Sequence, residues 1–170
     1  MIKAIKKELC DKAKGLQVCQ TEMHALMAAK TIDELYTLYW DNIHFCIRRD
    51  FPAVRFFAAT RHEARKRHIY VGETSTLKAA GEYKAIFLGN CKSIIHTGNS
   101  HYTRLYVRHT SEITVYVSAG NVVVIDLFDN AKAIIKGAGD AKVTVFKMGG
   151  GHVEGNSVRV FEKQLNPLKP

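Results

Sequence analysis

The chain has 170 residues, of which 46% are hydrophobic and 24% charged, and its formal net charge is +9. This length allows one well-cored domain, or a small helical unit beside a second element, and excludes two large domains. The composition predicts a folded chain. No apolar run approaches the length that crosses a bilayer, and the charged first ten residues do not resemble an export signal. We therefore expect a soluble, cytoplasmic protein with no membrane partner.

The N-terminal part has the periodicity of short helices. Ile2, Ile5 and Leu9 fall on one face of a helix, and Gly15 is a favoured residue at a helix end. Further helices are predicted with a cap at Thr21, with a capping box at Thr31 and Glu34, across residues 41–50, and over residues 53–67 with Pro52 in the first turn. Residues 1–68 are therefore predicted to form a helical head.

From Ile69 onward the composition is typical of strands and turns, with many Val, Ile, Tyr, Thr, Gly and Asn residues. Turn-forming pairs recur about every ten residues, and an apolar run follows most of them. The pairs are Gly89-Asn90, Gly98-Asn99, Thr110-Ser111, Gly120-Asn121, Asp129-Asn130, Gly139-Asp140 and Gly155-Asn156. Residues 69–170 are thus predicted to be one repetitive β region.

Two architectures produce this rhythm, an antiparallel β-sandwich and a β-solenoid. The turns have the order small residue, Asn or Asp, small residue, rather than the Asn-Gly order of two-residue hairpins, which favours the solenoid. The fold class is therefore predicted to be α+β, a short-helix N-terminal bundle capping a C-terminal β-solenoid, with the antiparallel sandwich as the alternative. The charged, proline-bearing tail over residues 161–170 is expected to protect the other end of the stack.

Three phrases of the chain suggest a kinship. Residues 109–115 (HTSEITV), 128–132 (FDNAK) and 139–143 (GDAKV) resemble the "DNA-x-V" repeat of small accessory proteins from Bacteroidota genomes, their phages and mobile elements. The helical head of those proteins often contains a Trp followed by an Arg-Asp-Phe-Pro-like stretch, to which Trp40 and residues 49–52 are similar. The resemblance implies a phage or mobile-element context and a folded binding protein, and it carries over no catalytic residues.

The net charge raises the expectation of a polyanionic partner, and clustered arginines are the candidate contacts. Arginine presents planar forked donors that suit phosphate or carboxylate, although cations near a helix C-terminus also complement the helix dipole. The candidate partner-binding or nucleic-acid-binding residues are Arg48, Arg49, Arg55, Arg61, Arg65, Lys66, Arg67, Arg104 and Arg108. A stripe of Lys132, Lys142 and Lys147 with the last two arginines is expected if the repeats stack in register. A solvated, non-binding surface is the alternative interpretation.

Catalytic and metal-binding patterns are missing from the sequence. Cys10, Cys19, Cys46 and Cys91 do not have zinc-ligand spacing, so we expect reduced thiols, no metal and no cofactor. No phosphate-binding loop, nucleophile elbow or zinc-protease motif is present. A non-enzyme is therefore predicted. Metal-free RNA cleavage by histidines among His96, His101 and His109 is kept as an alternative.

Taken together, these features predict a non-enzymatic binding protein of a phage or mobile element. Its expected partner is a host nucleoprotein effector or a nucleic acid, with RNA favoured over DNA, and its most concrete form is an inhibitor of a host defence complex, of the anti-CRISPR kind. A self-assembling structural β-solenoid is the first alternative and the histidine-dependent nuclease the second.

Overall fold

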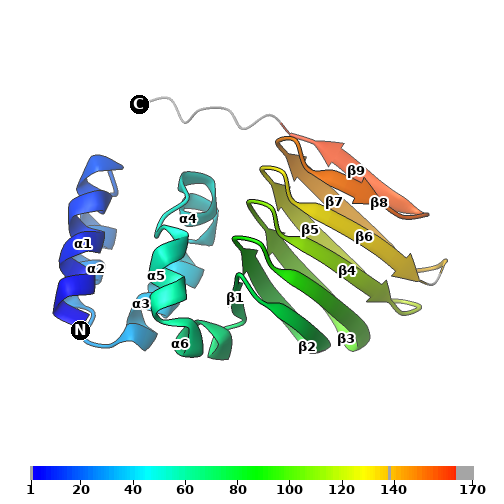
Figure 1. Ribbon diagram of the computed structural model, residues 1–170, viewed down its shortest axis with the longest axis horizontal. Coiled ribbons are helices and arrows are strands. Elements are labelled where there is room, and N and C mark those ends of the chain that lie inside the picture. Colours follow the sequence, from blue (N-terminus) through cyan, green and yellow to red (C-terminus); the bar gives the residue numbers. More distant parts are fainter. Residues whose placement is uncertain (1, 138, 164–170) are drawn as a thin grey trace. The chain divides into compact units, whose positions relative to one another are not determined.

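A computed structural model of the chain describes residues 2–137 and 139–163. The chain divides into a helical unit that ends at Arg67 and a β unit that begins at His68 (Figure 1). The fold class is α+β with a parallel β-solenoid, as the sequence predicts. The capping of the solenoid by the helical head stays a prediction. The predicted protective role of the tail falls largely on residues 164–170, which lie outside the described residues.

Helices of the first unit begin and end close to the residues expected from the sequence. They are α1 (Ile2–Gly15), α2 (Gln20–Ala28), α3 (Ile32–Asp41), α4 (Ile43–Arg49), α5 (Val54–Ala59) and α6 (Arg61–Lys66). Thr31 caps α3, because its Oγ1 accepts a hydrogen bond from the Glu34 backbone N–H at 3.1 Å. The predicted cap of α2 by Thr21 is wrong, since this helix already begins at Gln20 and Cys19 precedes it.

One helix expected over residues 53–67 is two helices separated at Thr60. The Thr60 hydroxyl lies 2.6 Å from the Tyr36 hydroxyl and donates at 2.8 Å to the Phe56 carbonyl oxygen. A β-branched residue whose side chain is held in this way leaves helical geometry at low cost, and Thr60 has φ −120° and ψ 31°. The predicted single helix over residues 53–67 is therefore wrong, because the chain leaves helical geometry at Thr60.

Aromatic rings form much of the core of the helical unit. Tyr36 and Phe57 are fully buried, with ring centroids 6.1 Å apart, and Tyr39 meets Phe57 edge to face at 4.9 Å. Burial and edge-to-face contact of such rings are large stabilising terms in small cores. Tyr36, Tyr39 and Phe57 are therefore core residues of the helical unit.

Strands of the second unit pair only in parallel, so the antiparallel sandwich is wrong. They are β1 (Ile69–Val71), β2 (Thr74–Leu88), β3 (Lys92–Val107), β4 (Glu112–Val117), β5 (Val122–Phe128), β6 (Lys132–Gly137), β7 (Lys142–Met148), β8 (His152–Glu154) and β9 (Val158–Glu162). β4, β6 and β8 continue the first half of β3 and form what we call the β4 layer. β5, β7 and β9 continue its second half and form the β5 layer (Figure 1).

The repeat that stacks is 20 residues long rather than ten. Lys92 pairs with Glu112, Glu112 with Lys132 and Lys132 with His152, each step covering 20 residues. Each ten-residue unit seen in the sequence is therefore half a coil, and successive units alternate between the β4 and β5 layers. Equivalent residues ten positions apart do not stack on one another.

Turns after the β5 layer use one left-handed backbone position in every coil. Gly89, His109, Asp129 and Gly149 all have positive φ and follow one another at 20-residue steps. Glycine adopts this conformation without steric cost, and Asp and His are among the residues that tolerate it best. The predicted turn at Gly98-Asn99 is wrong, because these residues lie inside β3, opposite the place where the β2–β3 register shifts.

Aliphatic side chains fill the space between the two layers. Leu105, Ile125 and Val145 stack in register and are fully buried, and Ile113 and Val115 are fully buried in the β4 layer. Polar side chains bond along the stack at the turns, as in solenoids generally. For example, the Asn121 Oδ1 accepts from the Thr97 hydroxyl at 2.8 Å and from the Ser118 N–H at 3.1 Å.

Truncation of a stacked core residue should test this packing. Leu105→Ala removes a fully buried side chain and should lower the free energy of unfolding by roughly 2–5 kcal/mol. Ile94→Ala on the same strand is the matched control, because Ile94 is 40% exposed, and it should cost less than about 1 kcal/mol. Urea unfolding followed by circular dichroism measures both. Equal losses would contradict the assignment of the interior.

Candidate partner-binding surfaces

Helix α6 carries exposed cations at its two ends. Arg61, Arg65 and Lys66 are exposed, whereas Ala64 is buried and anchors the helix. Within residues 2–137 and 139–163, no carboxylate forms an ion pair with Arg61 or Lys66, although the Lys66 charge helps to lower the pKa of Asp33. Exposed cations without a direct ion pair remain available to a partner. We call Arg61 and Lys66 the α6 cations.

Two other predicted arginines are engaged within the helical unit. Arg55 Nη2 lies 2.5 Å from Glu8 Oε1, and Arg67 donates from Nε to Asp33 Oδ1 at 2.8 Å. Hydrogen bonds from these guanidinium groups lower the pKa of Glu8 and of Asp33 below their usual values. Arg55 therefore links α5 to α1, and Arg67 links the end of α6 to α3. Both charges are partly neutralised inside the helical unit.

Arg48 and Arg49 lie apart from the α6 cations. Both are exposed in the last turn of α4, and among the described residues no carboxylate pairs with either. Figure 1 shows α4 and α6 at opposite ends of the helical unit. The structure therefore does not bring the two groups into one cluster, and Arg48 and Arg49 also complement the carbonyl end of their own helix.

The two predicted arginines of the β unit form ion pairs along the stack. Arg104 donates from Nη2 to Asp126 Oδ2 at 2.7 Å and lies over the Tyr106 ring at 5.3 Å. Arg108 donates from Nε to Asp129 Oδ2 at 3.0 Å and is only 9% exposed. A partner that bound these guanidinium groups would have to compete with carboxylates that are already aligned.

The Asp129 carboxylate shows how strongly the second pair is held. Burial alone would raise its pKa, but hydrogen bonds from Arg108 and from the His109 backbone N–H, at 2.9 Å, hold it below the usual value. This carboxylate therefore joins two successive turns of the solenoid, and its role is structural.

Sequence reasoning missed an exposed ladder on the β4 layer. Lys78, His96, Tyr116 and Lys136 pair in register on successive strands, and all four are exposed. The rings of His96 and Tyr116 stack at 4.9 Å, and the Lys136 Nζ lies 5.6 Å from the Tyr116 ring centre. No described carboxylate forms an ion pair with Lys78 or Lys136. We call this set the Tyr116 ladder.

In the amino-acid sequence, the 20-residue spacing of His96, Tyr116 and Lys136 was the signal that could have revealed this ladder. The stripe predicted from the ten-residue repeat is wrong, because Lys132 lies in the β4 layer and Lys142 in the β5 layer. Lys132 is also neutralised by Glu154, whose Oε1 lies 2.8 Å from its Nζ. The basic character of the β4 layer is therefore concentrated in the Tyr116 ladder.

His101 and His109 are too far apart along the chain to act as an acid and base pair. His101 lies in β3 and His109 follows the end of this strand, eight residues later. Eight residues of extended strand span roughly 25 Å. His109 Nδ1 accepts a hydrogen bond from the Gly89 N–H at 3.1 Å, and His96 stacks on Tyr116. Paired proton transfer requires groups within hydrogen-bond reach of one reacting site, which His101 and His109 do not meet.

The described part of the chain contains no metal-ligand cluster, no disulfide and no helix that could cross a membrane. Residues 2–137 and 139–163 contain no cluster of three or more potential metal ligands. All four cysteines are free thiols. No helix in the described ranges has both the length and the apolar composition needed to cross a bilayer. Comparison with protein-family models, with curated proteins and with solved structures gave no match.

The Arg108–Asp129 pair makes a testable contribution to stability. Asp129→Asn keeps a residue that tolerates the left-handed conformation but removes the carboxylate charge that pairs with the buried Arg108. We expect the free energy of unfolding to fall by roughly 1–3 kcal/mol. Urea unfolding near neutral pH measures it, and an unchanged midpoint would contradict the assigned role.

The same variant has a predicted pH dependence. Because the folded-state pKa of Asp129 lies below the ordinary value of 3.8, its charge stabilises the fold fully above that value. The contribution disappears as the pH falls through the lowered folded-state pKa. The difference in stability between wild type and Asp129→Asn should therefore shrink below about pH 4, which denaturation curves over a pH series would show.

Proposed function

We propose that this chain is a non-enzymatic binding protein that docks basic surfaces onto a nucleoprotein or nucleic-acid-binding effector. The observation that carries the proposal is the set of exposed cations without a described carboxylate partner, Arg61 and Lys66 on α6 and Lys78 and Lys136 on the solenoid. Exposed cations of this kind attract phosphate backbones and acidic protein surfaces through long-range electrostatics.

The solenoid supports this role by its rigidity. The Tyr116 ladder is fixed by backbone pairing in every coil, so its side chains need little ordering when a partner binds. Pre-organised surfaces gain affinity because the entropic cost of binding is smaller. Aromatic and cationic side chains together are also typical of interface hot spots.

The resemblance to phage and mobile-element accessory proteins gives the proposal its most concrete form. In that form the partner is a host defence complex that carries RNA, and binding of this chain inhibits it in the manner of an anti-CRISPR protein. Cytoplasmic location is part of the same proposal. The wide separation of His101 and His109 speaks against the nuclease alternative.

A pull-down with charge-reversed variants tests the proposal. Arg61→Glu with Lys66→Glu removes the α6 cations, and Lys3→Glu with Lys7→Glu is the matched control, because Lys3 and Lys7 are exposed on α1 and the change in net charge is equal. Tagged full-length chains are incubated with host lysate, with and without nuclease treatment, and captured protein and nucleic acid are identified.

We expect wild type and the α1 control to retain one nucleoprotein complex in both lysates, and the α6 variant to lose about tenfold or more of it. Equal retention by the α6 variant and the control would overturn the role of the α6 cations. Equal loss in both would show a non-specific charge effect. Melting temperatures of the three proteins should agree within a few degrees, because the changed side chains are exposed.

A self-assembling solenoid is the second candidate function, and the last coil favours it. β8 and β9 stand at the end of the strand order, and among the described residues no strand pairs with their outer edges. Val160 and Phe161 in β9 are 45% and 50% exposed. An open strand edge with apolar side chains is a template for pairing with another chain.

The assembly candidate predicts oligomers that grow with concentration and resist nuclease. Val160→Lys should abolish them by placing a charge at the open end, whereas Ile94→Lys, at a similarly exposed site away from that end, should not. Light scattering coupled to size-exclusion chromatography measures the mass. A monomeric wild-type chain at the highest soluble concentration would remove this candidate.

A further inference from the structure

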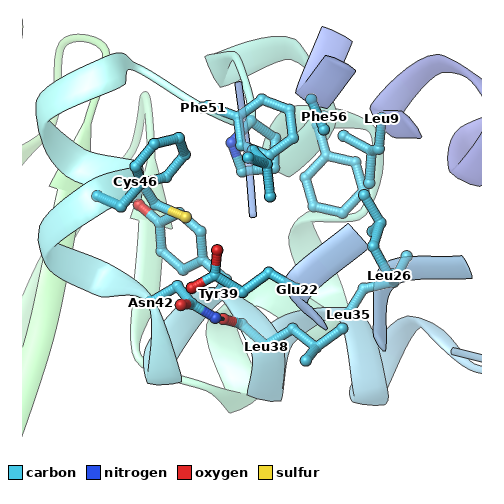
Figure 2. A pocket seen from close by; sticks show the side chains of 14 residues that line it. Leu9, Glu22, Leu26, Leu35, Leu38, Tyr39, Asn42, Cys46, Phe51 and Phe56 are labelled. Atoms are coloured by element: carbon cyan, nitrogen blue, oxygen red, sulfur yellow. Dashed lines mark hydrogen bonds between the residues drawn. The ribbon is translucent and has the colours of Figure 1, made fainter. Parts of the chain in front are cut away.

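The helical unit contains a pocket that the proposed function does not use. Side chains from α1, α2, α3 and α4 and from residues 51–56 line a small pocket that is partly open to solvent (Figure 2). Its wall is apolar over most of its area, with Leu9, Leu26, Leu35 and Leu38 among its aliphatic side chains. A pocket this small admits a slim molecule rather than a large ring system.

One carboxylate stands in this apolar wall. Figure 2 shows the Glu22 side chain reaching from α2 to the middle of the pocket, with Tyr39, Asn42 and Cys46 around it. No cation pairs with Glu22 in the part of the chain that the structure describes. A carboxylate beside apolar surface loses part of its hydration without an ion pair to replace it, which favours binding of a cation.

The buried Cys46 thiol is influenced by the negative charge of Glu22. Burial, and to a smaller extent the nearby negative charge of Glu22, raise the pKa of Cys46 to about 12. The thiol therefore stays protonated and neutral at physiological pH. Glu22 is consequently the charged group that faces a ligand in this pocket.

Aromatic rings complete the surroundings of the carboxylate. Tyr39 on α3, Phe45 on α4, Phe51 before α5 and Phe56 on α5 line the pocket. The face of an aromatic ring attracts a cation through its quadrupole, and this attraction grows when water is excluded. Rings and a carboxylate together recognise an ammonium group, while the leucines accept an alkyl chain.

We propose that the pocket of the helical unit binds a small apolar amine in its protonated form, with the ammonium group at Glu22 and the alkyl chain among the leucines. Neither the basic surface on α6 nor the Tyr116 ladder takes part. The ligand proposed for this pocket is a cation, whereas the partner proposed for the arginines of the helical unit is an anion.

Hexylammonium chloride is a suitable probe, and hexan-1-ol is its neutral counterpart of the same length. The full-length protein, labelled with ¹⁵N, is titrated with each probe while backbone amide resonances are followed. Glu22→Gln keeps the size and hydrogen-bonding groups of the side chain but removes the charge. Asp41→Asn, at an exposed carboxylate on α3, is the matched control.

We expect hexylammonium to shift resonances of pocket-lining residues and its dissociation constant to rise about tenfold in Glu22→Gln, with no change in Asp41→Asn. Hexan-1-ol should bind wild type and Glu22→Gln equally, because it lacks the charge. Equal binding of hexylammonium to wild type and Glu22→Gln would overturn the proposal. So would shifts confined to residues outside the pocket, or no saturable binding by wild type.

Discussion

Parallel backbone pairing between successive coils, in steps of 20 residues from β3 to β7, sets the positions of the stacked side chains in this part of the β unit. Once the step is fixed, Leu105, Ile125 and Val145 must stack inside, and His96, Tyr116 and Lys136 must stack outside. The left-handed turn position, filled by Gly89, His109, Asp129 and Gly149, follows from the same register. Core, turns and candidate binding surface are therefore consequences of one geometric constraint.

Arginine has two roles in this protein, and its surroundings decide between them. Arg104 and Arg108 lie against aromatic rings and meet Asp126 and Asp129 of the following coil, so their charges stabilise the stack. Arg61 stands on a short exposed helix without a described carboxylate partner, so its charge is directed outward. Residue type alone does not separate these cases, because the distinction depends on which carboxylates the fold brings within reach.

The helical unit combines a packed side with an unfilled one. On the packed side, the Tyr36 ring contacts Phe57, and its hydroxyl lies within hydrogen-bond distance of the Thr60 hydroxyl. Thr60 is the residue that separates α5 from α6. On the other side Leu26, Phe51 and Phe56 leave a pocket whose wall contains Glu22. Apolar pockets between helices are where small ligands bind.

The amino-acid sequence determined the elements and the fold class, since helix caps, apolar periodicity and recurrent turns are local signals that survive in any tertiary context. Thr31 and the change at Ile69 are examples. Only the tertiary structure decided the coil length, the pairing of Arg104 and Arg108, the Tyr116 ladder and the surroundings of Glu22. Each of these depends on contacts between residues about 20 or more positions apart. A ten-residue spacing of turns in the sequence is equally compatible with a full coil of ten residues and with half of a longer coil. Backbone pairing between coils resolved that ambiguity, because hydrogen bonds along the stack form in one register only.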